Sequence, residues 1–152
     1  METSMQSWSG VDKPVDAALM FNCFINVEPA DRQALIRQLF SQHLAPNGVV
    51  ITIETGDRDS GFMHLMERLG NPQKDYYYDE VERDMLAAGF SLVCTQAFKG
   101  SSDLSNPSED LMKYVQLSAN NQVSEQEVRA AIADIYGSTE INFYSMMGVF
   151  KK

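Results

Sequence analysis

The segment Val15–Glu54 constrains the fold of this chain more than any other. It consists of an almost wholly apolar strand, a helix with one apolar stripe and Arg32 on its outer face, and a second apolar strand that follows Pro46-Asn47-Gly48. Strands that are apolar on both faces lie in parallel sheets covered by helices. We therefore predict a βαβ unit of an α/β protein. Such sheets bind ligands at the carboxyl ends of their strands, here Asn22-Cys23-Phe24 and Glu54-Thr55-Gly56.

The rest of the chain continues this alternation and then departs from it. We predict strands near 15–23, 48–54, 90–98 and 140–150. A helix follows the second strand at 62–69, and another begins where Asp79 caps the chain with Glu82 three residues later. Two further helices start near Ser108 and at the capping box Ser124–Glu127 and form an inserted pair before the last strand. The predicted order is β-α-β-α-α-β-α-α-β in a single domain spanning 1–152.

The composition indicates a globular protein and excludes some partners. The chain has 152 residues, 44% of them hydrophobic, and a formal charge of −9. Because nucleic acid and anionic membranes attract clustered Lys and Arg, we expect neither as a partner. The polar start METSMQSWSG and the lack of a long apolar run indicate a cytoplasmic protein. Cys23 and Cys94 both fall in predicted buried strands, as is typical of reduced core cysteines.

The sequence lacks the patterns of nucleophilic, metal and nucleotide sites. His43 and His64 are the only histidines, and neither has a second ligand at metal spacing, so no metal site is predicted. No Gly-x-Ser-x-Gly motif and no local Cys–His pair is present, so no catalytic residue is assigned. No Gly-x-Gly fingerprint is present either.

Two aromatic or methionine-rich segments have two interpretations each. Tyr76-Tyr77-Tyr78 is either a stacking surface for an aromatic ligand or packing ahead of a helix. The face formed by Phe62, Met63 and Met66 is either core or the wall of a pocket beside the carboxyl edge of the sheet.

The first strand raises a question of assembly. Ala17–Cys23 has the composition of a central strand, yet no strand precedes it in this sequence. An unpaired apolar strand edge recruits other strands. We therefore expect this edge to be covered by a second copy in a homodimer or by a separate N-terminal half.

The motifs together resemble a known family. The block Asp16–Glu54, with L-A-P-N-G before its second strand, resembles the C-terminal half of a class I S-adenosylmethionine-dependent methyltransferase. Five further features are similar to histamine N-methyltransferase-like proteins: the opening E-T-S, S-G-F-M-H-L-M-E-R-L-G, Y-x-x-D-E-V ahead of a helix ending A-G-F, the inserted helical pair, and N-F-Y-x-M-M in the last strand. The resemblance implies a partial Rossmann-like fold whose mixed sheet carries the last strand antiparallel, between the second and third. It also implies that 1–152 is the C-terminal portion of the domain and lacks the glycine-loop half.

The resemblance also implies roles for individual residues. It places two residues at the cofactor and four around a small amine substrate: Ser4 and Phe21 for the cofactor, and Asn22, Phe62, Met66 and Asn142 for the amine. Met66 stands where the family has an aromatic residue, and Asn22 is shorter than the usual glutamine. The resemblance therefore implies a small, histamine-like amine without specifying histamine.

The implied reaction is methyl transfer from S-adenosylmethionine by in-line displacement, which depends mainly on proximity and orientation. A covalent nucleophile is unnecessary. The glycine loop and the acidic residue for the ribose are missing from this sequence, so we expect the chain alone to bind S-adenosylmethionine weakly or not at all and to be inactive. The alternative is a non-catalytic half-domain that serves assembly with another chain.

Overall fold

The computed structural model describes residues 13–23, 27, 29–56, 61–70, 77–103, 105, 108–119, 123–137 and 140–152. The chain forms two compact units. The first comprises Met1–Gly56, Asp75–Phe98 and Ser145–Lys152, and the second comprises Asp57–Lys74 and Lys99–Tyr144.

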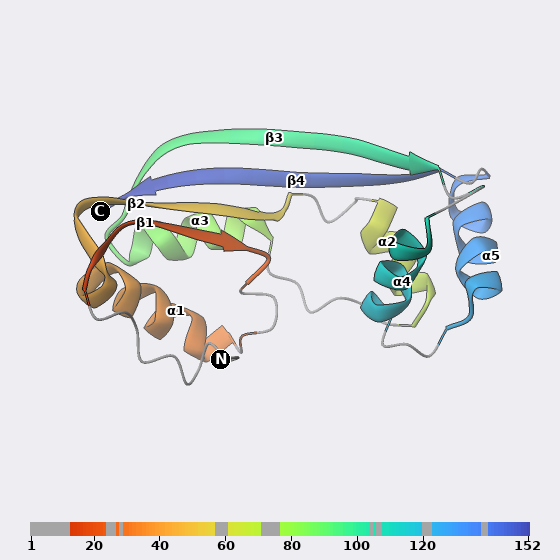
Figure 1. The fold of residues 1–152 in the computed structure, drawn as a ribbon, viewed down its shortest axis with the longest axis horizontal. Coiled ribbons are helices and arrows are strands. Elements are labelled where there is room, and N and C mark those ends of the chain that lie inside the picture. Colours follow the sequence, from red (N-terminus) through yellow and green to blue (C-terminus); the bar gives the residue numbers. More distant parts are fainter. Residues whose placement is uncertain are drawn as a thin grey trace. The chain divides into compact units, whose positions relative to one another are not determined.

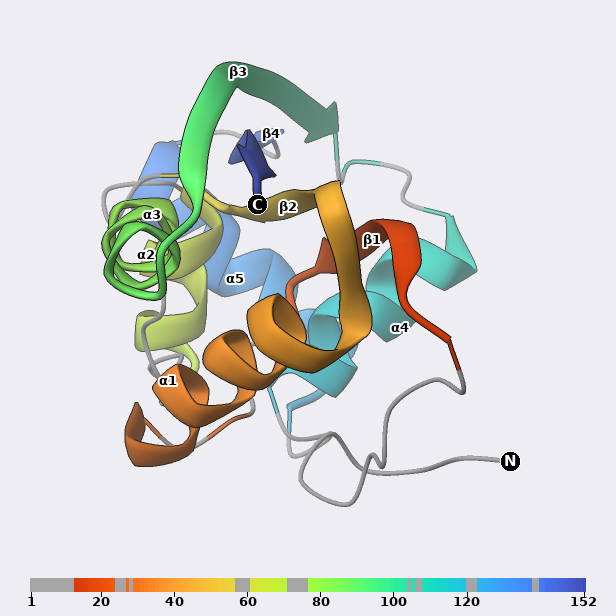
Figure 2. The same cartoon turned by 90° about the vertical axis from the view of Figure 1, so that its left-hand side faces the viewer.

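The elements follow one another in the predicted order, with one addition. A π-helical turn, η3, continues directly from the first helix. The elements are β1 (Val15–Phe21), α1 (Pro29–Gln38), η3 (Leu39–His43), β2 (Leu44–Thr55), α2 (Gly61–Arg68), α3 (Tyr78–Ala87), β3 (Ser91–Asp103), α4 (Glu109–Ser118), α5 (Glu125–Tyr136) and β4 (Glu140–Lys151) (Figures 1 and 2).

The four strands form one mixed sheet in the order β1-β2-β4-β3. β1 pairs with β2 in parallel, and β4 pairs with β2 antiparallel. The register of the antiparallel pair sets Phe150 opposite Val50, Gly148 opposite Thr52 and Met146 opposite Glu54. The predicted topology, with the last strand antiparallel between the second and the third, is confirmed.

The start of β2 differs from the prediction. The strand begins at Leu44 instead of residue 48 and contains the Pro46-Asn47-Gly48 segment as an irregularity. The pairing with β1 jumps from Val15–Leu44 to Ala17–Val49, so the extra residues are absorbed on β2 alone. Asn47 has a φ of 66°, in the left-handed region that asparagine tolerates better than most residues. The turn chemistry was predicted correctly, but the turn lies within the strand.

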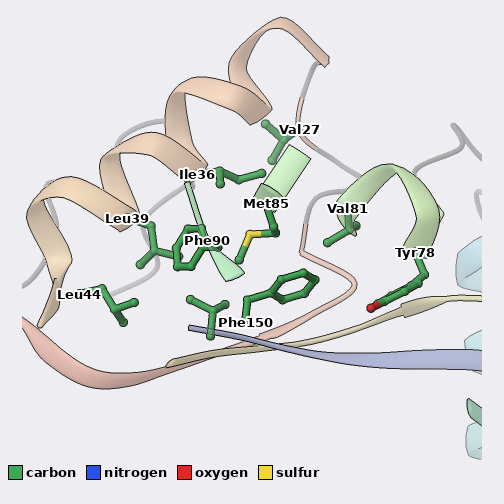
Figure 3. Close-up of a cluster of buried hydrophobic side chains, with 10 residues drawn as sticks. Val27, Ile36, Leu39, Leu44, Tyr78, Val81, Met85, Phe90 and Phe150 are labelled. Atoms are coloured by element: carbon green, nitrogen blue, oxygen red, sulfur yellow. The ribbon is translucent and has the colours of Figure 1, made fainter. Parts of the chain in front are cut away.

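The core of the first unit lies between the sheet and two helices. Figure 3 shows α1 and α3 on the same side of β1, β2 and β4. β2 alternates along its length, so that Val50, Thr52 and Glu54 point toward the helices. Phe150 is fully buried at the centre of this cluster. The buried members are Val27, Ile36, Leu39, Leu44, Val50, Tyr78, Val81, Met85, Phe90 and Phe150.

The second unit has its own helical core. Leu65 and Met66 of α2 pack with Ile132 of α5 and with residues of α4 and β4. The phenol ring of Tyr136 occupies the space where a side chain at position 61 would project, so Gly61 permits this close approach of α2 and α5.

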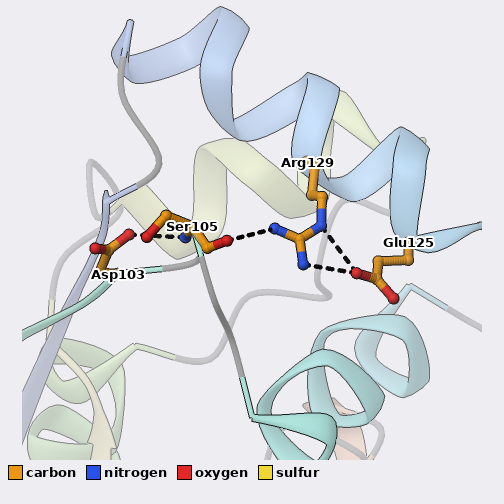
Figure 4. Close-up of polar contacts among 4 residues, drawn as sticks. All are labelled: Asp103, Ser105, Glu125 and Arg129. Atoms are coloured by element: carbon orange, nitrogen blue, oxygen red, sulfur yellow. Dashed lines mark hydrogen bonds and ion pairs between the residues drawn. The ribbon is translucent and has the colours of Figure 1, made fainter.

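The helix start at Ser124 is confirmed. The Ser124 N–H donates to Glu127 Oε2 at 2.7 Å, and the Glu127 N–H donates to Ser124 Oγ at 3.3 Å, which completes the reciprocal capping box. One turn later Arg129 contacts Glu125 Oε1 at 2.6 Å and donates to the Ser105 carbonyl oxygen at 3.3 Å (Figure 4). These contacts tie α5 to the segment after β3.

The predicted start of α3 is wrong by two residues. The helix is capped at Tyr77, whose N–H donates to Glu80 Oε2 at 3.1 Å. Glu80 therefore occupies the N3 position that the sequence analysis gave to Glu82. The sequence offered two acidic residues at neighbouring positions, and burial of Tyr77 and Tyr78 fixed the register. For these two tyrosines, packing is the correct interpretation.

The expectation that both cysteines lie in the core is wrong. Cys94 is exposed, and Cys23 is half-buried. β3 is an edge strand, and its residues from Ser91 to Ser101 are all exposed, including Val93 at 58%. The apolar sequence of this segment therefore predicted a strand correctly, but its predicted burial was wrong.

Candidate functional site

The carboxyl ends of β1 and β2 lie side by side, as the βαβ pattern requires. Phe21 pairs with Ile53, and the Asn22 N–H donates to the Ile53 carbonyl oxygen at 2.9 Å. Asn22 then leaves the strand direction with a φ of 42° and is exposed. Asn22 therefore ends the ladder and presents its side chain at the edge where parallel sheets bind ligands.

Glu54 is a carboxyl group buried at this same edge. Its residue is only 1% exposed, and it continues the inward-facing row that begins with Val50 and Thr52. The cross-strand neighbour on β4 is Met146, so an apolar side chain stands directly opposite. A carboxyl group in such surroundings is uncommon unless it has partners.

Only one of the two carboxyl oxygens of Glu54 has a hydrogen-bond partner among the described residues. The Cys23 N–H donates to the carboxyl group, and the positive charge of Arg32 acts on it from α1. The other oxygen, Oε1, is buried and has no hydrogen-bond partner among the described residues. Burial raises the pKa of Glu54 to about 8, although the Cys23 N–H and Arg32 act in the opposite direction. Glu54 is therefore mostly uncharged at neutral pH.

Arg32 and Cys23 complete this edge. Arg32 is 6% exposed, and its Nε donates to the Val27 carbonyl oxygen at 2.8 Å. The prediction that Arg32 lies on the outer face of its helix is therefore wrong. The Cys23 thiol donates to the Phe21 carbonyl oxygen at 3.2 Å. Burial raises the pKa of this thiol, and the Glu54 carboxylate adds to the effect. A raised pKa disfavours the thiolate, so Cys23 is poorly suited to act as a nucleophile.

The six predicted site residues are distributed over both units. Ser4 lies outside the described residues. Phe21, 52% exposed, and Asn22 belong to the carboxyl edge of the first unit. The remaining three, Phe62, Met66 and Asn142, belong to the second unit. The prediction that four of these residues surround one pocket stays a prediction.

Within the second unit the three residues have different environments. Phe62 is half-buried, and its ring centroid lies 5.5 Å from that of Phe143. Met66 is fully buried in the helical core. Asn142 is exposed and alternates along β4 with the buried Ile141 and with Phe143, so it projects from the other face of the strand. Phe62 and Met66 therefore share a core, and Asn142 does not face it.

Glu54 was predicted to lie at the carboxyl edge of the second strand, but no role was predicted for it. The available signal was the period-two alternation of Val50, Thr52 and Glu54, which puts the carboxyl group on the same face as a core valine. The available signal for Arg32 was its helical spacing, since it lies four and seven residues before the buried Ile36 and Leu39 and therefore on the same helix face.

A separate hollow lies in the second unit. It has a volume of about 510 Å³ and is bordered by an exposed ion pair in which Arg68 Nε and Asp134 Oδ2 are 3.2 Å apart. Its wall also includes Glu127, whose carboxylate is engaged in the cap of α5. The lining residues are Arg68, Leu69, Val123, Glu127, Ala130, Ala131 and Asp134. None of the five predicted site residues that the structure describes borders this hollow.

Two findings concern other site classes. In the described ranges, no three His, Cys, Asp or Glu side chains cluster in a way that could hold a metal ion. None of the helices in the described part of the chain combines the length and apolar character that a bilayer span requires.

Comparison with known proteins gives relatives in structure only. No protein-family model and no curated protein matches the sequence at a significant level. A candidate methyltransferase from Bacillus halodurans superposes with a TM-score of 0.66 at 9% identity, over 99% of this chain and 70% of that one. A SAM-dependent methyltransferase from Methanosarcina mazei superposes with a TM-score of 0.55 at 11% identity, over 99% and 65%. The [4+2]-cyclase SpnF gives 0.52 at 16% identity, over 99% and 55%.

These likenesses define the class of fold. The chain has the α/β architecture of S-adenosylmethionine-dependent methyltransferases, with a mixed four-stranded sheet and its last strand antiparallel. The cyclase among the similar structures illustrates that one fold carries more than one reaction. The activity must therefore be argued from the site.

Proposed function

We propose that this chain is the C-terminal portion of an S-adenosylmethionine-dependent N-methyltransferase that acts on a small, histamine-like amine. The observation that carries the proposal is the carboxyl edge of β1 and β2, where Asn22 and Glu54 stand on a methyltransferase-type sheet. The order and spacing of the family-like motifs from Asp16 to Met147 support the narrower substrate class. A cytoplasmic location belongs to the same proposal.

The residues present would contribute binding and orientation. The cofactor supplies an electrophilic methyl group, and no covalent nucleophile is needed. The Asn22 amide, exposed at the end of β1, can hydrogen-bond a polar group of the amine. Phe62 would contribute an apolar wall to the substrate pocket, a role that rests on the family resemblance. Because positioning dominates such a reaction, these contacts would act mainly by orienting the amine nitrogen.

The fit of the cofactor to this chain is partial. Phe21, more than half exposed at the end of β1, offers an apolar surface where the resemblance places the cofactor. The sequence contains no glycine-rich loop for the methionine end and no acidic residue in the position that binds the ribose. Most of the polar contacts to the cofactor would have to come from another segment.

We expect this chain to bind S-adenosylhomocysteine weakly or not at all in isothermal titration calorimetry. Each missing hydrogen bond should cost about 1 kcal/mol or more, so several of them lower affinity by orders of magnitude. Addition of a segment with the glycine loop should restore binding. A low-micromolar dissociation constant for the chain alone would contradict the prediction.

One observation favours the alternative function, a half-domain that serves assembly. β1 lies at the end of the sheet order, and Leu19 and Phe21 on its outward face are 60% and 52% exposed. Large apolar side chains on an edge strand promote pairing with another strand. A symmetric pair of β1 edges would bury these side chains about a two-fold axis.

If this edge mediates association, Leu19→Lys should weaken it at least tenfold in sedimentation experiments while leaving the fold intact. The charge would be buried at the contact but remains in water in the monomer. Leu19 suits this test better than Met20, which is half-buried and packs against the core of the first unit. Leu86→Lys is the matched control, because Leu86 is 46% exposed on α3, away from this edge. A wild-type monomer at high concentration would argue against self-pairing.

A further inference from the structure

Two buried oxygen atoms on the helix-covered face of β2 lack hydrogen-bond partners among the described residues. They are Thr52 Oγ1 and Glu54 Oε1, on residues that are 0% and 1% exposed. The two side chains point to the same face, since they are two positions apart on one strand. Leaving a buried polar group unpaired costs about 1–3 kcal/mol. Such groups in a native structure usually have a water, ion or ligand as partner.

The neighbours of these atoms determine what could bind there. Cys23 at the end of β1 and Arg32 on α1 are the titratable or charged groups that act on Glu54. From β4, Met146 and Gly148 stand opposite Glu54 and Thr52 and carry no charge. From α3, the Tyr78 hydroxyl lies beside Gly148. Burial, with a further contribution from Glu82, raises the pKa of Tyr78, so this phenol stays uncharged near neutral pH.

The site is therefore rich in oxygen acceptors and has a carboxyl group that can become negative. Arg32, whose Nε donates to the Val27 carbonyl oxygen, lowers the pKa of Glu54, but burial outweighs this effect and Glu54 Oε1 still has no hydrogen-bond partner among the described residues. A group that carries several N–H donors and a positive charge is the chemical complement of these oxygens. An amino group has three N–H donors when it is protonated.

We propose that Glu54, assisted by the Thr52 hydroxyl, binds the amino group of a small-molecule amine at the carboxyl edge of β1 and β2. The identification of this amine as a methyl acceptor rests on the proposed function. Glu54 lies close to Asn22 in the structure. The Asn22 N–H donates to the carbonyl oxygen of Ile53, the residue before Glu54, and the N–H of Cys23, the residue after Asn22, donates to the Glu54 carboxyl group. The amide and the carboxyl group could then hold two different polar groups of one amine.

Binding of the amine would release one proton to solvent. At pH 7 the free amine is R–NH₃⁺, and Glu54 is a neutral carboxylic acid. When the two meet, one proton leaves to solvent, and one remains shared between the nitrogen and a carboxyl oxygen. If it moves to the oxygen, the nitrogen has a free lone pair, which is the form that can attack a methyl group. The release of one proton holds for either position of the shared proton.

The test is calorimetric titration of the full chain with histamine and with phenethylamine at pH 7. Each titration is repeated in two buffers of different ionisation enthalpy, which yields the number of protons released. We expect about one proton per amine bound to the wild type. Glu54→Gln should abolish the release and weaken binding at least tenfold. Thr52→Val, which removes only the hydroxyl, should weaken binding about fivefold, as expected for one hydrogen bond.

The controls separate this inference from the proposed function. Glu67→Gln removes an exposed carboxylate on α2 and should change neither affinity nor proton release. Amine binding that is equal in wild type and Glu54→Gln would overturn the inference and leave an amine-binding function intact. Competition by millimolar potassium or ammonium chloride would also overturn it, since the site would then be a general cation site. Circular dichroism spectra and Glu54→Asp, which keeps the carboxyl group, distinguish lost binding from lost folding.

Discussion

Near pH 9, Glu54→Gln is expected to be more stable than the wild type by several kcal/mol, whereas near pH 5 the two proteins should differ little. Burial raises the pKa of Glu54 to about 8 from an ordinary value of 4.5. Ionisation of this carboxyl group is therefore much easier in the unfolded chain than in the folded one. Glutamine has a similar shape and no charge to bury.

The direction of the pH dependence follows from proton linkage. Between pH 4.5 and about 8 the folded state binds more protons at Glu54 than the unfolded state does. The stability of the wild type therefore falls as pH rises through this interval, by at most about 1.4 kcal/mol per pH unit from this one group. Below the interval Glu54 is neutral in both states, and above it the loss is complete.

Urea unfolding followed by circular dichroism from pH 4 to pH 9 would measure this effect. The informative quantity is the difference in unfolding free energy between wild type and Glu54→Gln at each pH, because other titrating groups cancel in it. Glu67→Gln, which removes an exposed carboxylate on α2, is the matched control variant. A flat difference for Glu54→Gln would show that Glu54 is not desolvated in the native state.

Phe150→Ala should destabilise the protein by about 3–5 kcal/mol, enough to unfold a marginally stable chain at 37 °C. Phe150 is fully buried and joins β4 to the core that α1 and α3 cover (Figure 3). Truncation removes a ring from this cluster and leaves a cavity beside Val50, its partner across the sheet. Little can collapse into the space, because the neighbouring Gly148 has no side chain.

Two further variants test whether the loss of stability in Phe150→Ala comes from the buried ring. Phe150→Leu keeps most of the apolar volume and should cost roughly a third to a half as much. Val149→Ala removes atoms from the other face of the same strand, where the side chain is only half-buried, and should cost about 1 kcal/mol or less. Equal losses for Phe150→Ala and Val149→Ala in urea unfolding would contradict the placement of the core on one face.

The strand and helix pattern could be predicted because it depends on local sequence. The apolar runs at Val15–Phe21 and Val49–Ile53 and the capping box at Ser124 each specify their element by themselves. The position of β4 between β2 and β3 came from the family resemblance, because neighbouring residues do not specify strand order. The N-cap of α3 was predicted at Asp79 instead of Tyr77, because Glu80 and Glu82 both fit the N3 position of a capping box. Only the packing of Tyr77 and Tyr78 distinguishes the two alternatives.

Local sequence was enough to locate the carboxyl edge of β1 and β2, since Asn22 and Glu54 lie at the ends of the apolar runs that become these parallel strands. The exposure and protonation of the groups at that edge depend on tertiary contacts. A carboxyl group's charge depends on how much water reaches it, and water access depends on segments distant in the sequence, such as Met146 on β4. Packing between segments distant in the sequence therefore explains why Glu54 is buried and mostly neutral and why Arg32 is buried as well. It also explains why Cys94 is exposed despite its apolar neighbours in sequence.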